Sequence, residues 1–330
     1  MNETGAPSQD RNGSTHVVVG AGPLGLAVAR QLRRRREPVR MVTRGGRADV
    51  PEDVEVVAAD VGDPHQAGRA FERGRVVYQC AASRYSQWPA LLPRLMGGVI
   101  EGAAAVEARI IYGDNLYAYG RVGGPLTEDL PYRPVGPNGR TRARVAEALM
   151  AAHRDGRVRA AIGRGSDFFG PHVMTSTVGE QVFARLASGR RAQVLGNPDL
   201  PHTVTFIDDF ARALMILGSR EEALGEVWHV PSAETVTLRR FVEMIGEQMG
   251  HPAKLSVAPP WTLAVIGLFN PDLGAVREIL YQSQEPWIVD HSKFERAFGA
   301  DPTPHPQAIR TTLEWFSREG PSRRRAHRAP

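Results

Sequence analysis

A glycine-rich turn near the start of this 330-residue chain has the spacing of a dinucleotide-binding site. The turn, Gly20-Ala21-Gly22-Pro23-Leu24-Gly25, fits the pattern G-x-G-x-x-G between an expected strand and an expected helix. Gly20 permits a tight turn, Gly22 lets the backbone approach a pyrophosphate, and Gly25 allows close packing of the helix on the strand. Because a helix N-terminus attracts anions, we expect a dinucleotide to bind here, with Pro23 and Leu24 among its contacts.

The end of the second expected strand, Val39–Thr43, indicates which dinucleotide would bind. An NAD site usually has an acidic residue about 20 residues past the glycines. Here Thr43 and Arg44 stand at that point, and Asp49 falls in the following loop. A hydroxyl and a guanidinium can bind the 2′-phosphate that a carboxylate would repel, so NADP is favoured over NAD. The alternative is that Arg44 is an ordinary solvated loop residue.

The ends of the next two expected strands supply further candidate cofactor contacts. Asp60, followed by Val61, is placed to meet the edge of an adenine ring. Cys80, Ala81 and Ala82 offer a path of small side chains past the cofactor. We interpret Cys80 as a small buried strand residue rather than a nucleophile.

Four further motifs follow the glycine turn in order. They are Asp114-Asn115-Leu116-Tyr117-Ala118-Tyr119-Gly120, Thr127-Glu128-Asp129, Arg164-Gly165-Ser166-Asp167-Phe168-Phe169-Gly170-Pro171 and Phe206-Ile207-Asp208-Asp209. They resemble the S-S-x-x-V-Y-G, acidic turn, R-x-x-N-V-Y-G-P and H-V-x-D motifs of the extended short-chain dehydrogenases/reductases, the NAD-dependent epimerase/dehydratase type. The resemblance covers residues 15–316 and implies a Rossmann fold with NAD(P) as cofactor.

The resemblance implies three catalytic side chains, and this chain has other residue types at all three positions. In the family a Ser or Thr orients the substrate hydroxyl, a Tyr exchanges its proton, and a Lys binds the ribose and lowers the tyrosine pKa. Asn115, Asn138 and Arg142 stand at these positions. Arg142 could still hold the ribose hydroxyls, whereas Asn138 cannot exchange a proton at neutral pH.

If the protein does this chemistry, another residue must handle the proton. Tyr117 is the best candidate, two residues past Asn115 on the same loop, with ordinary packing as the alternative. Asp114 could act if desolvation raised its pKa, and Asp167 is a third candidate. The ten histidines show no metal-ligand spacing, so we expect no metal.

The resemblance also bears on the substrate. Family members that bind nucleotide sugars hold the diphosphate with the Asn of R-x-x-N and with an Arg before H-V-x-D. Here these positions are Asp167, which would repel phosphate, and His202, which is usually neutral at pH 7. We therefore expect an uncharged or apolar substrate in an aromatic-lined pocket, although ordinary core packing is the alternative for each aromatic. The candidate lining residues are Tyr85, Trp88, Phe168, Phe169 and the segment Trp261–Phe269.

Alternating strands and helices would position these residues. We expect strands at 16–19, 39–43, 54–59, 76–80, 109–112 and 158–162, and helices at 23–36, within 89–107 and at 140–153. This alternation predicts an α/β fold with a doubly wound parallel sheet. The less regular remainder predicts a smaller C-terminal substrate lobe. The predicted domains are 15–165 with 203–231 returning to it, the lobe at 166–202 and 232–316, and disordered ends at 1–14 and 317–330.

Charge and composition limit the partners. The net charge is +5, but residues 317–330 hold five Arg and one Glu and so contribute +4, which argues against a nucleic-acid-binding face. The longest apolar run, Trp261–Phe269, is too short to cross a bilayer. The first 14 residues have no apolar signal segment, and the single cysteine excludes a disulfide framework. We expect a cytoplasmic protein with a small-molecule substrate and no membrane partner.

Three functions fit these observations. The first is an NADP-binding oxidoreductase with a non-standard proton donor, which moves hydride between the nicotinamide and a carbonyl or alcohol carbon. The second is a non-catalytic NADP-binding sensor, favoured by the exchanged Tyr and Lys. The third is an epimerase or dehydratase that retains NAD. The resemblance also implies a homodimer paired through the helices within 89–107 and 140–153.

Overall fold

The computed structural model describes residues 15–258, 272 and 277–318. Seven strands form one sheet in the order β11-β6-β5-β4-β1-β2-β3, and every neighbouring pair is parallel. The bounds are β1 Thr15–Val19, β2 Val39–Thr43, β3 Glu55–Ala58, β4 Gly74–Gln79, β5 Arg109–Asp114, β6 Arg159–Arg164 and β11 Val227–His229. The predicted doubly wound α/β fold is confirmed.

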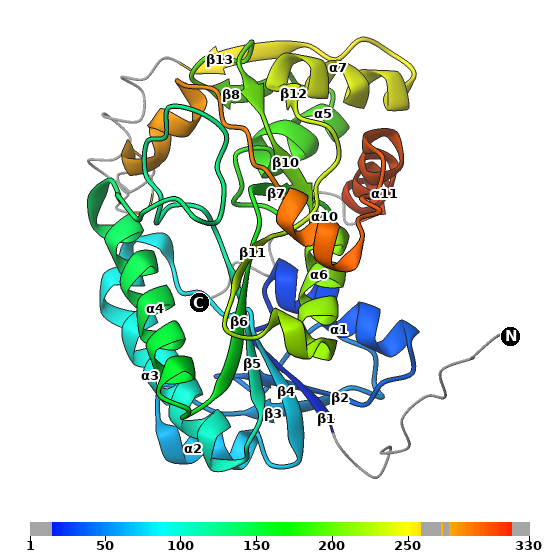
Figure 1. Ribbon diagram of the computed structural model, residues 1–330. Coiled ribbons are helices and arrows are strands. Elements are labelled where there is room, and N and C mark those ends of the chain that lie inside the picture. Colours follow the sequence, from blue (N-terminus) through cyan, green and yellow to red (C-terminus); the bar gives the residue numbers. More distant parts are fainter. Residues whose placement is uncertain (1–14, 259–271, 273–276, 319–330) are drawn as a thin grey trace, which may run out of the picture.

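Helices cover both faces of the sheet (Figure 1). One face carries α1 (Pro23–Arg34) and α6 (Ile207–Ser219), and the other carries α2 (Pro64–Ala70), α3 (Trp88–Ala105) and α4 (Gly136–Arg154). Alternate residues of β1 pack against the two helix layers, because successive side chains along a strand point to opposite faces of the sheet. Val18 packs in the cluster with α1 and α6, whereas Val17 and Val19 pack with α2, α3 and α4.

Smaller sheets and several helices form the upper part of the molecule in Figure 1. Three two-stranded sheets pair β7 with β10, β9 with β12, and β8 with β13. The strands are β7 Asp167–Phe169, β8 Ala192–Leu195, β9 Pro201–His202, β10 Val204–Phe206, β12 Val236–Thr237 and β13 Leu255–Ala258. The helices include α5 Arg185–Ala187, α7 Leu238–Met249, α10 Ser292–Phe298 and α11 His305–Arg318.

Several element boundaries differ from the expected ones. The first helix ends at Arg34, and Arg36 has a positive φ of 60°. β5 continues to Asp114 and β6 to Arg164, so both charged side chains lie at strand ends. The last helix runs on to Arg318, while the rest of the expected tail and the segment Trp261–Phe269 lie outside the described residues.

The strand order places the site. β1 lies between β2 and β4, so the order reverses at β1, and ligands of such sheets bind outside the carboxyl ends of the strands at this point. The glycine turn follows β1, Cys80 follows β4, and Asp114 ends β5 at the same edge. No helix of the described part is long and apolar enough to cross a membrane.

Candidate functional site

The glycine turn has the shape that its sequence predicts. Gly20 has a φ of +96°, and a Cβ there would lie 2.7 Å from the Ala81 Cα, so the turn packs directly on the segment after β4. A Cβ on Gly25 would lie 1.9 Å from the Gly20 carbonyl oxygen. A Cβ on Gly22, in contrast, would have no described atom within 4 Å. Gly22 caps α1, whose first turn has no acidic residue, so the backbone here is open to an anion.

One of the two groups expected to bind a 2′-phosphate at the end of β2 already has hydrogen-bond partners. The Thr43 hydroxyl hydrogen-bonds the backbone of Arg47, accepting from its N–H at 3.2 Å. Arg44 is exposed and close enough to Asp60 to lower its pKa slightly. Asp60 itself accepts a hydrogen bond from Arg94 at 2.7 Å, which is the largest cause of its lowered pKa. Thr43 is therefore a turn-forming residue, and Asp60 already has a cationic partner.

Three aromatic side chains expected near the substrate form one cluster. Tyr85 and Trp88 have ring centroids 4.4 Å apart, and Tyr117 lies 6.2 Å and 6.1 Å from them. The Arg142 guanidinium lies over the Trp88 ring at 4.0 Å, a cation–π contact. Burial raises the pKa of Tyr117, and the charge of Asp167 raises it further, so the phenol is protonated at neutral pH.

A buried carboxylate between two arginines lies beside this cluster. Asp114 is 3% exposed and accepts from Arg142 at 3.1 Å and from Arg164 at 3.1 Å. Arg142 also donates to the Tyr112 hydroxyl at 2.6 Å, and Arg164 donates to the Tyr132 hydroxyl at 2.8 Å. The three charged groups carry one excess positive charge. The ribose role expected for Arg142 would thus compete with three existing contacts.

Sequence reasoning missed Arg164 as a site residue. A signal existed, because Arg164 ends the strand next to β5, and parallel strands place their carboxyl ends side by side. Asp114 and Arg164 are register partners. Buried nitrogens remain on both arginines, since Arg142 Nε and Arg164 Nη1 have no hydrogen-bond partner in the described part of the chain.

Each of the two asparagines expected at family catalytic positions takes part in one hydrogen bond that involves a backbone N–H. The Asn115 side-chain oxygen accepts from the Tyr117 backbone N–H at 3.1 Å and so shapes the loop after β5. Asn138 lies buried in the first turn of α4, and its backbone N–H donates to Glu278 at 3.0 Å. Glu278 therefore links the segment 277–283 to the start of α4.

The structure brings together two predicted substrate residues that lie on different strands. His202 Nε2 is 2.9 Å from an Asp167 carboxylate oxygen, and the two side chains are 3% and 10% exposed. Burial raises the pKa of Tyr281 to about 12, and the charge of Asp167 adds to the increase. Phe168 is half-buried against Phe210.

One aromatic expected to line the substrate pocket packs in the core instead, and the Cys80 thiol has a raised pKa. Phe169 packs in the core against Phe183, Phe206 and Phe241, so it does not line a substrate site. Burial raises the pKa of the Cys80 thiol, which disfavours a thiolate nucleophile. In the described part of the chain no three His, Cys, Asp or Glu side chains are grouped to hold a metal.

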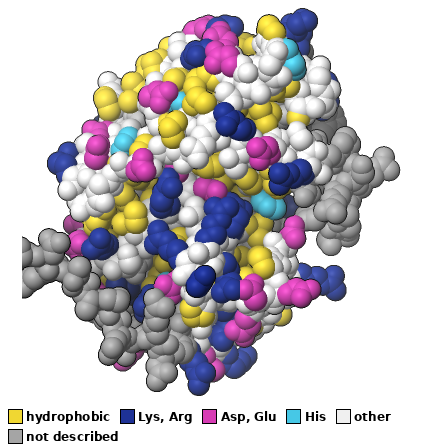
Figure 2. All heavy atoms as spheres, turned by 90° about the vertical axis from the view of Figure 1, so that its right-hand side faces the viewer, with side chains coloured by type: hydrophobic (Ala, Val, Ile, Leu, Met, Phe, Trp, Pro, Cys, Tyr) yellow, Lys and Arg dark blue, Asp and Glu magenta, His cyan; other side chains and the backbone are white. Residues whose placement is uncertain are grey.

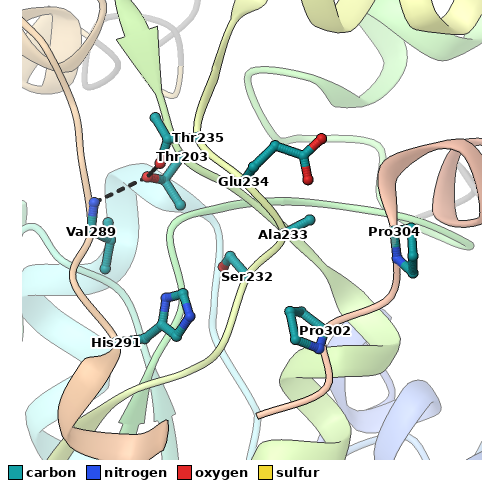
Figure 3. Close-up of a pocket in the computed structure, with 9 residues that line it drawn as sticks. All are labelled: Thr203, Ser232, Ala233, Glu234, Thr235, Val289, His291, Pro302 and Pro304. Carbon is teal, nitrogen blue, oxygen red and sulfur yellow. Dashed lines mark hydrogen bonds between the residues drawn. The ribbon is translucent and has the colours of Figure 1, made fainter.

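A cavity of about 340 Å³ is lined in part by Thr203, the residue that follows His202 in the chain (Figure 3). The Thr203 hydroxyl accepts from the Val289 N–H at 3.0 Å, and Figure 3 shows the His291 ring directed toward Ser232. A second cavity, of about 510 Å³, is lined by charged residues including Glu128, Arg154 and Lys293. Neither cavity is lined by the glycine turn.

Solved structures with this fold cover almost the whole chain. UDP-glucuronic acid 4-epimerase from Bacillus cereus, in complex with NAD, is 15% identical with a TM-score of 0.74, covering 92% of this chain and 99% of the relative. An epimerase from Methanothermobacter thermautotrophicus is 19% identical with a TM-score of 0.79, covering 96% and 95%. UDP-glucose 4-epimerase from Thermus thermophilus, in complex with NAD, is 20% identical with a TM-score of 0.73, covering 92% and 98%. At these identities the likeness shows a shared fold.

A match to a family model, rather than the shared fold, identifies the family of this chain. The search of curated proteins found no match. The family model described as "NAD dependent epimerase/dehydratase family" matches residues 16–230, which include the glycine turn, the Asp114–Arg142 pair and β11. Since this span exceeds half of the chain and contains the whole parallel sheet apart from Thr15, the chain belongs to the NAD-dependent epimerase/dehydratase family.

Proposed function

We propose that this protein binds a nicotinamide dinucleotide and acts as an enzyme of the epimerase/dehydratase type on a small substrate. The observation that carries the proposal is the open backbone at Gly22, which has no described atom within 4 Å of its missing side chain. It lies at the N-terminus of α1, where N–H groups attract a pyrophosphate. When bound, the nicotinamide supplies a hydride acceptor or donor for a carbon that bears a hydroxyl or carbonyl oxygen.

Tyr117 is the proposed proton carrier. Burial raises the pKa of Tyr117 and keeps its phenol protonated, whereas the positive charge of Arg142 lowers this pKa. Tyr117 can therefore donate a proton to a substrate oxygen as that oxygen gains charge, and take it back in the reverse direction. Asp114 suits this task less well, because guanidinium groups hold both of its oxygens.

We propose NAD as the dinucleotide. The expected preference for NADP depended on Thr43 and Arg44 acting together, and the Thr43 hydroxyl is engaged with Arg47. Of these two expected groups, Arg44 remains for a 2′-phosphate. NAD is also the cofactor named for the epimerases of Bacillus cereus and Thermus thermophilus that share this fold.

A second candidate function is dinucleotide binding without catalysis. Asn138 stands at the family's tyrosine position, and Arg142 is held by Tyr112, Asp114 and Trp88. A protein that only senses the dinucleotide would need the glycine turn and no proton carrier.

Binding and turnover experiments separate these functions. The purified protein is titrated with NAD, NADP and their reduced forms, and co-purifying nucleotide is identified by mass spectrometry. Binding of none of them would overturn the proposal. Where binding is seen, NADH oxidation is followed with a panel of ketones and aldehydes, with Tyr117→Phe as the test variant. Turnover lost in Tyr117→Phe supports the enzyme, unchanged turnover excludes Tyr117 as the proton carrier, and binding without turnover favours the sensor.

A further inference from the structure

Asp167 is a buried carboxylate without an arginine or lysine partner in the described chain. Its side chain is 10% exposed, and its one ion-pair partner there is His202, at 2.9 Å from Oδ2. The other oxygen, Oδ1, has no hydrogen-bond partner among these residues. Oδ1 is not among the fully buried side-chain atoms of the described residues that lack a partner, so it keeps accessible surface and can be reached by a ligand.

Three arginines near Tyr117, Tyr119 and Tyr281 pair with carboxylates other than Asp167. Arg142 and Arg164 both pair with Asp114, and Arg121 pairs with Glu285. Asp114, Arg142 and Arg164 together carry one excess positive charge. Both guanidinium groups face Asp114 and tyrosine hydroxyls, so this charge does not neutralise Asp167 by contact. His202 compensates Asp167 only when it is protonated.

Two tyrosines, Tyr117 and Tyr281, lie within electrostatic range of the carboxylate. The charge of Asp167 raises the pKa of Tyr117 and that of Tyr281, which places it near both rings. Tyr281 packs against Trp287 at 5.7 Å, and Trp287 pairs with His202 through the backbone. Aromatic faces attract cations, and a carboxylate among them favours an ammonium group over an anion.

We propose that the ligand of this site carries a protonated amine, which donates to Asp167 Oδ1 while His202 holds Oδ2. That this ligand is the substrate rests on the proposed function. The carboxylate would repel a diphosphate, so the site selects against nucleotide sugars by charge. The UDP-sugar epimerases that share this fold would differ from this chain in that respect.

The test compares two probes that differ only in the head group. Cyclohexylamine and cyclohexanol are titrated into the protein at pH 8, with and without NAD, by ligand-observed NMR. A buried charge-assisted hydrogen bond predicts about tenfold or more tighter binding of the amine. Asp167→Asn should remove the difference. Asp199→Asn is the control, because Asp199 is an exposed carboxylate of the same lobe paired with Arg239, and it should keep the difference.

Three results would overturn the inference. They are equal or absent binding of the two probes, amine selectivity that survives Asp167→Asn, and binding of UDP to the same site in competition with the amine. If the proposed function is wrong, the protein will not bind a dinucleotide, which is a different result from these three. Amine selectivity measured without NAD stands or falls independently of that result.

Discussion

Asp114 joins two arginines that come from different elements, α4 and β6. Removing its charge would leave both guanidinium groups buried without an anion, which is far costlier than losing a surface pair. We expect Asp114→Asn to lower the free energy of unfolding by about 3–5 kcal/mol. Urea denaturation measures it. Asp199→Asn removes an exposed pair and should cost about 1 kcal/mol or less, so equal losses in the two variants would contradict this view of Asp114.

Two glycines of the turn should have different roles, Gly22 in dinucleotide binding and Gly25 in folding. Gly22→Ala should keep the melting temperature and weaken dinucleotide binding about tenfold or more, because the added methyl group projects where the pyrophosphate would approach. Gly25→Ala should instead lower stability by about 1–3 kcal/mol, since its Cβ would overlap the Gly20 carbonyl. Calorimetry and thermal melts give both quantities. Gly97→Ala, at an open helical position, is the control that should change neither binding nor folding adversely.

Arg44 is the residue at which cofactor choice can be changed. Arg44→Asp places a carboxylate at the end of β2, where it would repel a 2′-phosphate and accept from a ribose hydroxyl. The ratio of NADP to NAD dissociation constants should therefore rise. Titration of both nucleotides measures the ratio, and an unchanged value would show that Arg44 does not face the adenosine ribose.

At the scale of elements, α2 depends on its cap. Asp63 accepts from the backbone N–H groups of His65 at 2.9 Å and Gln66 at 3.2 Å, which satisfies two donors at the helix N-terminus. We expect Asp63→Ala to lower the free energy of unfolding by about 1 kcal/mol. Chemical denaturation measures the loss, and Asp63→Asn should restore most of it. A full loss in Asp63→Asn would assign the effect to charge rather than capping.

The same helix shows what the sequence can and cannot predict about elements. The strand before the glycine turn and the helix after it were predictable, because buried runs and glycine spacing are local signals. The seven-residue α2 was not, since it is too short for an apolar period, although Asp63-Pro64 is a typical helix start. At the site, the pairing of Asp167 with His202 depends on how β7 and β9 pack, and no local pattern encodes that contact.

At the scale of the whole molecule, opposite charges are interleaved on the face in Figure 2, where Lys and Arg lie among Asp and Glu. A partly buried ion pair of Arg30 with Asp208 joins the helices α1 and α6. Exposed ion pairs, such as that of Arg239 with Asp199, contribute little each and weaken with salt. Much of the stability therefore rests on the two core clusters that cover the faces of the sheet.

Two buried histidines, His16 and His229, make the whole fold sensitive to acid. Burial, together with Arg75, lowers the pKa of His16 to about 4. Burial lowers that of His229 to about 3. His229 Nδ1 is 2.9 Å from the Asp290 carbonyl, which can only accept, so Nδ1 carries the proton and Nε2 accepts from the Tyr119 hydroxyl. A second proton, on Nε2, would turn the Tyr119 hydroxyl from donor to acceptor and would place a buried positive charge near Arg164.

The sign of the pH dependence follows from these two groups. Below about pH 6.5 the unfolded chain binds protons at both histidines, while the folded chain does not until the pH approaches their lowered pKa values. The free energy of unfolding should therefore fall between pH 7 and pH 5, by about 2 kcal/mol for each histidine. Urea denaturation across this range measures the slope. His16→Gln should flatten it by about half, whereas His65→Gln, at an exposed position, should leave it unchanged. Stability that is constant or rises on acidification would mean that neither imidazole is held neutral by the fold.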